Sequence, residues 1–208
     1  MSHHGTVVAD GDAEVDPHGL EFDVGGERWP YREKALLMLH KPAGYECSQK
    51  PKHHPGVTTL LPLPLRQRGV QPVGRLDADT TGLLLLTDDG ALIHRLASPK
   101  KHVPKVYEVE CAEPLTDAQL ADLRAGVVLH DDPLPVRAAV CERTGASSLR
   151  LTLLEGKYHQ VKRMVAAAGN SVVRLHRSGY GALVLPADLP PGAWRWLDGP
   201  EAVLGPPA

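Results

Sequence analysis

The sequence predicts an α+β protein with a mainly antiparallel, mixed sheet and few flanking helices. Most apolar segments are short and lie next to turn residues, as strands do, and only three segments have the features of helices. Strands therefore follow one another with few helices between them, which disfavours an alternating, parallel α/β arrangement. The composition, with 42% hydrophobic and 23% charged residues, is that of a folded globular protein.

The expected strands share a short apolar or alternating run that is bounded by turn residues or proline. In chain order they are 6–9, 20–24, 35–40, 82–87, 106–111, 127–129, 136–141, 149–154, 172–176 and 182–185. The runs at 35–40 and 82–87 are almost entirely apolar, which predicts buried strands. Lys41-Pro42 ends the first of them, because a residue before proline is restricted in conformation.

Three segments carry helix signals. Asp88 or Asp89 can cap a helix over 91–97, because a side-chain carboxylate accepts hydrogen bonds from free N–H groups. Thr116-x-x-Gln119 is a capping box that opens a helix over 117–124. A third helix is expected over 157–168, where apolar residues recur on one face. Residues 49–72 are rich in Pro, Lys, Arg and His, so we expect an irregular, exposed loop there.

The distribution of charge divides the chain. Residues 1–33 hold eight acidic and two basic residues, whereas the remainder holds 17 acidic and 21 basic residues, a net charge of +4. A mildly basic body permits RNA binding. We therefore expect an acidic N-terminal segment at 1–33, a main domain at 34–199 and a flexible tail at 200–208.

Several classes of protein and site are disfavoured. No apolar run approaches the roughly 20 residues that span a bilayer, and the polar N-terminus is unlike a secretory signal. The three cysteines form no C-x-x-C pair, so neither a disulfide framework nor a zinc knuckle is expected. The chain lacks a dinucleotide loop, a P-loop lysine and an H-E-x-x-H site, so we expect no cofactor and no metal. A reducing, cytoplasmic location is the simplest interpretation.

The most informative segment is 74–90, where Asp77 and Asp79 precede a very apolar strand. A charged loop beside a buried strand is a common place for a reactive group. An EF-hand calcium loop matches the spacing, but it needs flanking helices and prefers glutamate at its end. The D-x-D-x-T motif of haloacid-dehalogenase-type phosphatases also matches, although it closes a strand in a helix-alternating sheet. In a structural interpretation, Arg75 and Asp77 form an ion pair and Asp79 caps a turn.

Four ordered motifs distinguish among these alternatives. Gly74-Arg75-Leu76-Asp77, with 79–83 behind it, resembles the signature of pseudouridine synthases. Segments 41–45, 105–107 and 155–164 resemble the other motifs of that family, in the same order, and the resemblance runs from about 35 to 197. Tyr158-His159 in the last motif resembles the enzymes that modify 16S RNA of the small ribosomal subunit, whereas the 23S relatives more often carry Asn-Arg-Gln.

The resemblance implies the pseudouridine-synthase fold and the isomerisation of uridine in ribosomal RNA. It implies that Asp77 is the catalytic carboxylate, that Lys162 is its basic partner, and that Tyr107 stacks on the uracil. Basic and polar side chains around the motifs are expected to contact RNA: Lys41, Arg75, Arg95, Lys100, Lys101, Lys105, His159, Gln160 and Arg163. Taken alone, Lys162 would be a solvated helix residue, and the charged stretch 94–102 fits a solvated face as well as it fits phosphate contacts.

The N-terminus departs from the family pattern. Relatives often begin with an S4-type RNA-binding domain, and residues 5–29 resemble only its strand-and-turn tail, so we interpret 1–33 as an acidic remnant. We expect ribosomal RNA as the partner, in a small-subunit assembly particle, with a monomeric protein and no membrane. A 23S substrate, a D-x-D-x-T metal-dependent phosphatase and a non-catalytic RNA-binding module stay as alternatives. Pure binding would not require Asp77, Tyr107 and Lys162 together.

Overall fold

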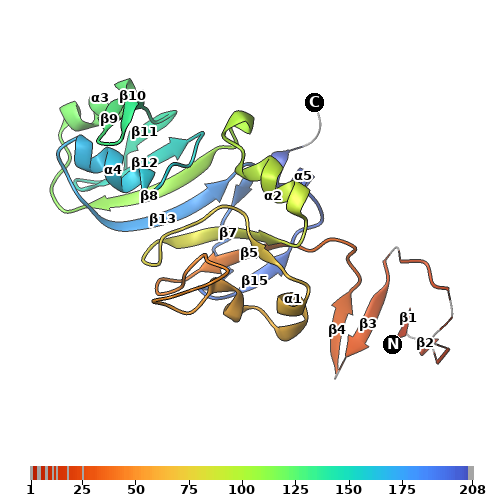
Figure 1. The fold of residues 1–208 in the computed structure, drawn as a ribbon. Coiled ribbons are helices and arrows are strands. Elements are labelled where there is room, and N and C mark those ends of the chain that lie inside the picture. The colour runs from red at the N-terminus through yellow and green to blue at the C-terminus, as the bar shows by residue number, and fades with distance from the viewer. Residues whose placement is uncertain are drawn as a thin grey trace. The chain divides into compact units, whose positions relative to one another are not determined.

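The computed structural model describes residues 2–3, 6–7, 9–10, 12, 14–17, 19–24 and 26–205, and the chain divides into two compact units, Met1–Lys34 and Ala35–Ala208 (Figure 1). In the first unit, β1 (Ser2–His3) pairs with β2 (Thr6–Val7), and β3 (Glu21–Val24) pairs with β4 (Glu27–Pro30). The strand expected at 6–9 is shorter here, and position 8 lies outside the described residues. The sequence did not predict β4.

The second unit is built on one mixed sheet with the strand order β11-β12-β8-β13-β7-β5-β15. Only β13 and β7 run parallel among the neighbours on this described path, so the mainly antiparallel, mixed sheet is confirmed. Two short strands, β6 and β14, pair at its sides, and β9 and β10 form a separate hairpin. The bounds are β5 (Leu36–Lys41), β6 (Gln71–Pro72), β7 (Thr81–Thr87), β8 (Lys105–Cys111), β9 (Val127–Leu129), β10 (Asp132–Val136), β11 (Val140–Arg143), β12 (Ser148–Leu153), β13 (Val172–Tyr180), β14 (Leu183–Val184) and β15 (Trp194–Trp196).

The predicted helix caps are confirmed. Asp89 accepts hydrogen bonds from the first turn of α2 (Gly90–Ala97), and Thr116 with Gln119 closes the capping box of α3 (Asp117–Ala125). The third helix, α4 (Gln160–Ala167), begins three residues later than expected. Two further short helices, α1 (Leu63–Gln67) and α5 (Glu201–Leu204), and two 3-10 turns, η1 (Val57–Leu60) and η2 (Pro99–Lys101), were not predicted.

Three expectations are wrong. The strand expected at 136–141 is broken, because Ala138 donates its N–H to Leu123 and turns the chain between β10 and β11. The segment 49–72 is not wholly exposed, since Val57, Leu61 and Leu65 are buried around η1 and α1. The tail expected at 200–208 instead forms α5 within its described part, where Val203 is fully buried, and positions 206–208 lie outside the described residues. Each of these two segments carries a few apolar side chains that pack against residues distant in sequence, so the local pattern did not reveal that they are buried.

The core surrounds the two central strands. Leu83, Leu84, Leu85 and Leu86 of β7 are fully buried, and burying one leucine stabilises the fold by about 2 kcal/mol. Leu92 and Leu96 of α2 pack into the same core. At the start of β7, Gly82 has a φ of 110°, and a Cβ there would lie 2.2 Å from the carbonyl oxygen of Arg177. A glycine therefore lets β13 approach β7 where the loop before β7 ends.

Candidate active site

The loop that carries Asp77 connects β6 to β7. Gly74 takes a positive φ of 72° at its start, and buried Leu76 anchors it to the core. The N–H of Thr80 donates to the carbonyl of Asp77 at 3.1 Å, which closes a tight turn. The carboxylate of Asp77 consequently projects from a fixed turn at the edge of a fully buried strand.

Lys41 anchors this loop through hydrogen bonds to its backbone. Its side chain is fully buried, and Nζ donates to the carbonyls of Pro42, Ala78 and Thr80 at 3.0, 3.1 and 2.8 Å. Burial lowers the pKa of Lys41, and the charges of Cys47, Asp79 and Asp77 oppose that change. The expectation that Lys41 contacts RNA is wrong for this structure, because all three donor positions of the ammonium group are used inside the protein.

Lys162 of α4 joins the two aspartates. Its Nζ lies 3.1 Å from Asp77 Oδ2 and 2.8 Å from each carboxylate oxygen of Asp79. Burial disfavours its charge, but the hydrogen bonds to Asp79 and Asp77 outweigh burial and raise the pKa of Lys162. The hydrogen bond from Lys162 lowers the pKa of Asp79. Lys162 lies beside Asp77 as predicted, while Asp79 is an ion-pair partner rather than only a turn cap.

His159 completes the surroundings of Asp77. Its Nε2 lies 3.0 Å from Asp77 Oδ1, so each carboxylate oxygen has its own basic neighbour. The backbone of His159 is left-handed, with φ 48° and ψ 32°, and it precedes the first residue of α4. That conformation costs a non-glycine residue about 1 kcal/mol or more and is characteristic of functional sites. It also explains why α4 begins at Gln160 and not at Lys157.

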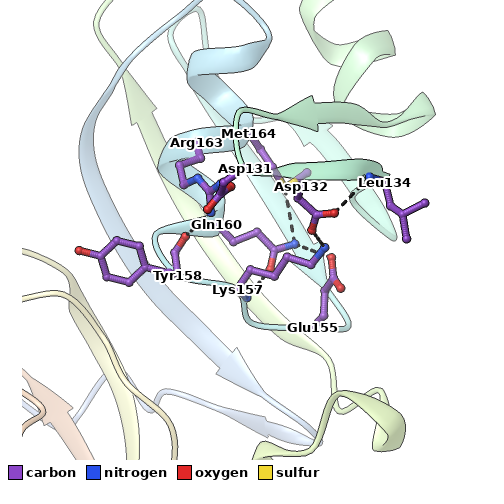
Figure 2. A network of polar contacts seen from close by, with 9 residues as sticks. All are labelled: Asp131, Asp132, Leu134, Glu155, Lys157, Tyr158, Gln160, Arg163 and Met164. Atoms are coloured by element: carbon purple, nitrogen blue, oxygen red, sulfur yellow. Dashed lines mark hydrogen bonds and ion pairs between the residues drawn. The ribbon is translucent and has the colours of Figure 1, made fainter.

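The β9–β10 hairpin braces the start of α4 (Figure 2). Asp132 pairs with Lys157, and Asp131 pairs with Arg163, which also donates to the carbonyl of Tyr158. Gln160 is buried, accepts from the N–H of Lys157 at 2.8 Å and donates to Glu155 at 2.8 Å. These contacts fix the loop that aims His159 at Asp77.

Tyr107 and two cations lie opposite the Asp77 loop. The register of β8 and β13 places Arg177 across from Tyr107, and Tyr180 across from Lys105. An irregularity in β13 between Arg177 and Gly179 turns the side chains of Arg177 and Tyr180 to the same, buried side. With Asp77, these four residues line a cavity of about 120 Å³, which has room for several water molecules or a small ring.

The structure separates the predicted RNA-contacting residues into two groups. Arg75, Arg95, Lys100 and Lys101 are exposed, and Arg75 lines the mouth of the cavity. Lys105 and Gln160 are buried, so neither can reach the RNA backbone at the surface. For Gln160 the expectation is corrected, because its amide is used inside the protein. Arg163 points away from Asp77, as its place on α4 predicts, and pairs with Asp131.

Sequence reasoning missed Arg177 and Tyr180 as site residues. Arg177 is only 2% exposed, and Tyr180 is only 1% exposed. The available signal was an arginine and a tyrosine inside the last long strand. A charged residue is rarely buried in a strand unless it faces a polar group or site. The bulge that brings both side chains to one face cannot be read from the sequence pattern, because it changes the alternation of the strand.

The alternative interpretations of Asp77 and Asp79 do not fit the surroundings. A fully extended strand, β7, follows the loop where an EF-hand needs a helix. The two carboxylates precede that strand instead of closing one. In the described part of the chain, no group of three or more His, Cys, Asp or Glu side chains could hold a metal ion. Within the same residues, no helix is long and apolar enough to cross a membrane.

Comparisons with known proteins agree with the geometry. The family model of the RNA pseudouridylate synthases matches residues 35–167. The chain is 46% identical to "Ribosomal small subunit pseudouridine synthase A" of Escherichia coli K12 over 180 residues, 85% of this chain and 78% of that protein. It is 41% identical to "Uncharacterized RNA pseudouridine synthase YtzG" of Bacillus subtilis, over 96% of this chain and 87% of the other. A solved structure, "Crystal structure of pseudouridylate synthase", aligns with a TM-score of 0.75 and 38% identity over 94% of this chain and 84% of that one.

Proposed function

The chain belongs to the RNA pseudouridylate synthase family, and on that premise we propose that it isomerises a specific uridine of 16S ribosomal RNA to pseudouridine. One observation carries the proposal beyond family membership. Asp77 has a basic side chain at 3.0–3.1 Å from each of its oxygens and lines a small cavity together with Tyr107. This arrangement holds the carboxylate in a fixed position at the cavity, where the reaction needs a nucleophile or a base.

The reaction conserves atoms and electrons. The C1′–N1 bond of uridine breaks, a C1′–C5 bond forms, and the hydrogen on C5 leaves as a proton while N1 gains one. No oxidant or metal is consumed. We assign Asp77 the role of the essential carboxylate, whether it attacks the sugar, attacks the base or removes a ribose proton. Lys162 pairs with this carboxylate at 3.1 Å and holds it in place, and Tyr107 offers a ring for stacking and a hydroxyl for proton transfer.

The target uridine must leave its stack to reach Asp77, which costs a few kcal/mol and favours irregular RNA. We assign Arg75, exposed at the cavity mouth, to the space that the uridine leaves or to the adjoining backbone. Arg95, Lys100 and Lys101 are exposed on and after α2, where they suit phosphate contacts. These contacts position the RNA, while the cavity selects the base.

We propose that the substrate is a small-subunit assembly particle and that the protein acts as a monomer in the cytoplasm. Residues 1–33 carry eight acidic and two basic residues, so this segment opposes binding to naked RNA. Selectivity then depends on RNA shape, which folded RNA with bound ribosomal proteins provides. The three cysteines are free and buried, in agreement with a reducing compartment.

The decisive experiment maps pseudouridine in 16S and 23S RNA from cells that lack this protein. We expect one pseudouridine to disappear from 16S RNA and to return with the wild-type gene but not with an Asp77→Asn gene. Purified protein is then tested on a short stem-loop, protein-free 16S RNA and a partly assembled particle, each with and without excess EDTA. We expect the particle to react best, and EDTA to inhibit only where magnesium loss unfolds the RNA.

Each arm can fail separately. A pseudouridine missing from 23S RNA would move the substrate to the large subunit. Equal turnover on all three RNAs would refute the need for an assembly particle. An unchanged pseudouridine map, together with no turnover in vitro on either RNA, would refute the proposed reaction itself.

A further inference from the structure

Two buried cations line the cavity and form no salt bridge with a carboxylate of the described residues. Lys105 is 9% exposed and Arg177 is 2% exposed, and both line the cavity that holds Asp77. Lys105 Nζ donates to the carbonyl of Val103 at 2.9 Å, and Arg177 Nε donates to the carbonyl of Leu83 at 2.8 Å. In the part of the chain that the structure describes, no salt bridge joins either cation to a carboxylate, and the charge of Glu155 acts on Lys105 from farther away.

One donor group of Arg177 is left over. Its Nη2 is buried and has no hydrogen-bond partner within the described structure. A charged donor in a protein interior needs a partner, so this N–H group is left for a water molecule or for a ligand that enters the cavity. Lys105 Nζ and Arg177 Cζ both lie over the ring of Tyr180, at 5.2 and 5.0 Å from its centroid. The ring face attracts both cations but accepts no strong hydrogen bond from them.

We propose that Lys105 and Arg177 bind the carbonyl edge of the flipped uracil and stabilise the negative charge that the base acquires when its bond to C1′ breaks. This inference rests on the proposed function. The electron pair of the C1′–N1 bond stays with the uracil, where O2 and O4 share the charge, so donors at the ring edge stabilise it. Tyr107 of β8, which lies opposite Arg177 in the pairing of β8 with β13, then stacks against the ring whose edge the cations hold.

The geometry favours a base edge over a phosphate. A phosphate of the RNA backbone is solvated and stays at the surface, where Arg75, Arg95 and Lys100 are exposed. Lys105 and Arg177 instead lie beneath apolar walls that include Leu153 and Leu175. A planar, uncharged ring can enter such a cavity without losing the hydration of a full charge. The cations then meet the charge of the base as the reaction creates it.

The test measures recognition of the base apart from turnover. In an Asp77→Asn background, affinity is compared for 16S RNA with uridine at the target and for the same RNA with an abasic nucleotide there. We expect the preference for uridine to fall by about tenfold or more with Arg177→Met or Lys105→Gln, because a hydrogen bond to a charged group is lost. Arg177→Lys should restore part of the preference. Arg95→Met is the matched control and should weaken binding to both RNAs equally.

A pH profile supplies a second readout, since a merely structural role would not move it. Burial, followed by the charge of Arg177, lowers the pKa of Lys105 to about 8, while Glu155 opposes the shift. The groups that face Lys105 are Arg177 and Tyr180 on β13, Glu155 after β12, and Tyr107 on its own strand. We expect single-turnover rates to fall as pH rises through about 8. Lys105→Arg should move this decline to higher pH, because arginine stays charged.

The outcomes separate this inference from the proposed function. If the wild type forms pseudouridine but the variants keep the full preference for uridine, the Lys105–Arg177 pair does not hold the base. Equal weakening on both RNAs would assign the pair to phosphate binding or to folding, and would also overturn the inference. If Arg177→Met does not fold, Lys105→Gln and the pH profile of Lys105→Arg decide alone. Absence of pseudouridine with the wild type would instead contradict the proposed function.

Discussion

The two walls of the cavity differ in how fully their buried cations are hydrogen-bonded within the protein. On the wall that carries Asp77, the buried Lys41 uses its ammonium group on three backbone carbonyls of the adjoining loops. On the opposite wall, Lys105 has one carbonyl partner, and Arg177 keeps a buried donor unsatisfied. A satisfied buried charge fixes the shape of a loop, whereas an unsatisfied one is available to a ligand. Two similar lysines thus indicate a supporting wall and a recognition wall.

The largest effect on turnover is expected at Asp77, on the wall that Lys41 supports. Asp77→Asn keeps the shape of the side chain and removes its charge, so isomerisation should be abolished while the fold and RNA affinity are nearly retained. The measurement is single-turnover formation of pseudouridine, with RNA affinity measured in parallel. Substantial residual turnover in the purified variant would overturn the assignment of Asp77.

Removing the support under that wall should mainly affect stability. Lys41→Met leaves three carbonyls without their donor, and each unsatisfied buried group costs about 1–3 kcal/mol. We expect the free energy of unfolding, measured by urea denaturation, to fall by about 3 kcal/mol or more. The matched control is Lys52→Met at an exposed position, which should have little effect. Equal unfolding midpoints for the two variants would contradict the supporting role.

Tyr107 tests the recognition wall. Tyr107→Phe keeps the ring for stacking and removes the hydroxyl, so the loss should affect turnover more than substrate affinity. A proton-transfer role is worth about a hundredfold or more in rate. Steady-state kinetics that separate kcat from KM provide the measurement. Wild-type kcat in this variant would exclude the hydroxyl from proton transfer.

Lys162 links the carboxylate of Asp77 to α4. Its pKa is raised, so the ammonium group stays charged through neutral and mildly alkaline pH. Lys162→Met leaves His159 as the remaining basic neighbour of Asp77, and we expect turnover to fall by about tenfold, because a hydrogen bond between charged groups is lost. Single-turnover rates of both proteins measure this. The control is Lys100→Met, which should alter RNA affinity and leave the single-turnover rate at saturating enzyme unchanged.

The smallest effect is expected at Asp79. Its side chain is 72% exposed, and the hydrogen bond from Lys162 lowers its pKa, so its charge is present at neutral pH and is lost only below the ordinary range of a carboxylate. Asp79→Asn weakens the hold on Lys162 but leaves the contact with Asp77, so we expect only a few-fold change in turnover. A loss comparable to that of Asp77→Asn would show that Asp79 takes part in the reaction.

Much of the fold follows from local pattern. The apolar runs at 35–40 and 82–87, the cap at Asp89 and the capping box at Thr116 depend on residues that are close in sequence, and the structure confirms them within a few positions. Motif order also predicted that Asp77 and Lys162 meet. That contact joins residues far apart in the chain, so the resemblance, and not the local pattern, carried the prediction.

The sequence by itself determined the class of the fold and the family of the enzyme, and it predicted Asp77 as the carboxylate, because these depend on composition and on ordered motifs. Tertiary structure alone decided what each cation does. Lys41 and Lys105 look alike in the sequence, yet backbone carbonyls surround the first and a cavity borders the second. Arg177 enters the site through a bulge and a parallel pairing of β13 with β7. Burial and hydrogen-bond satisfaction depend on neighbours that are distant in sequence, and a local pattern cannot specify them.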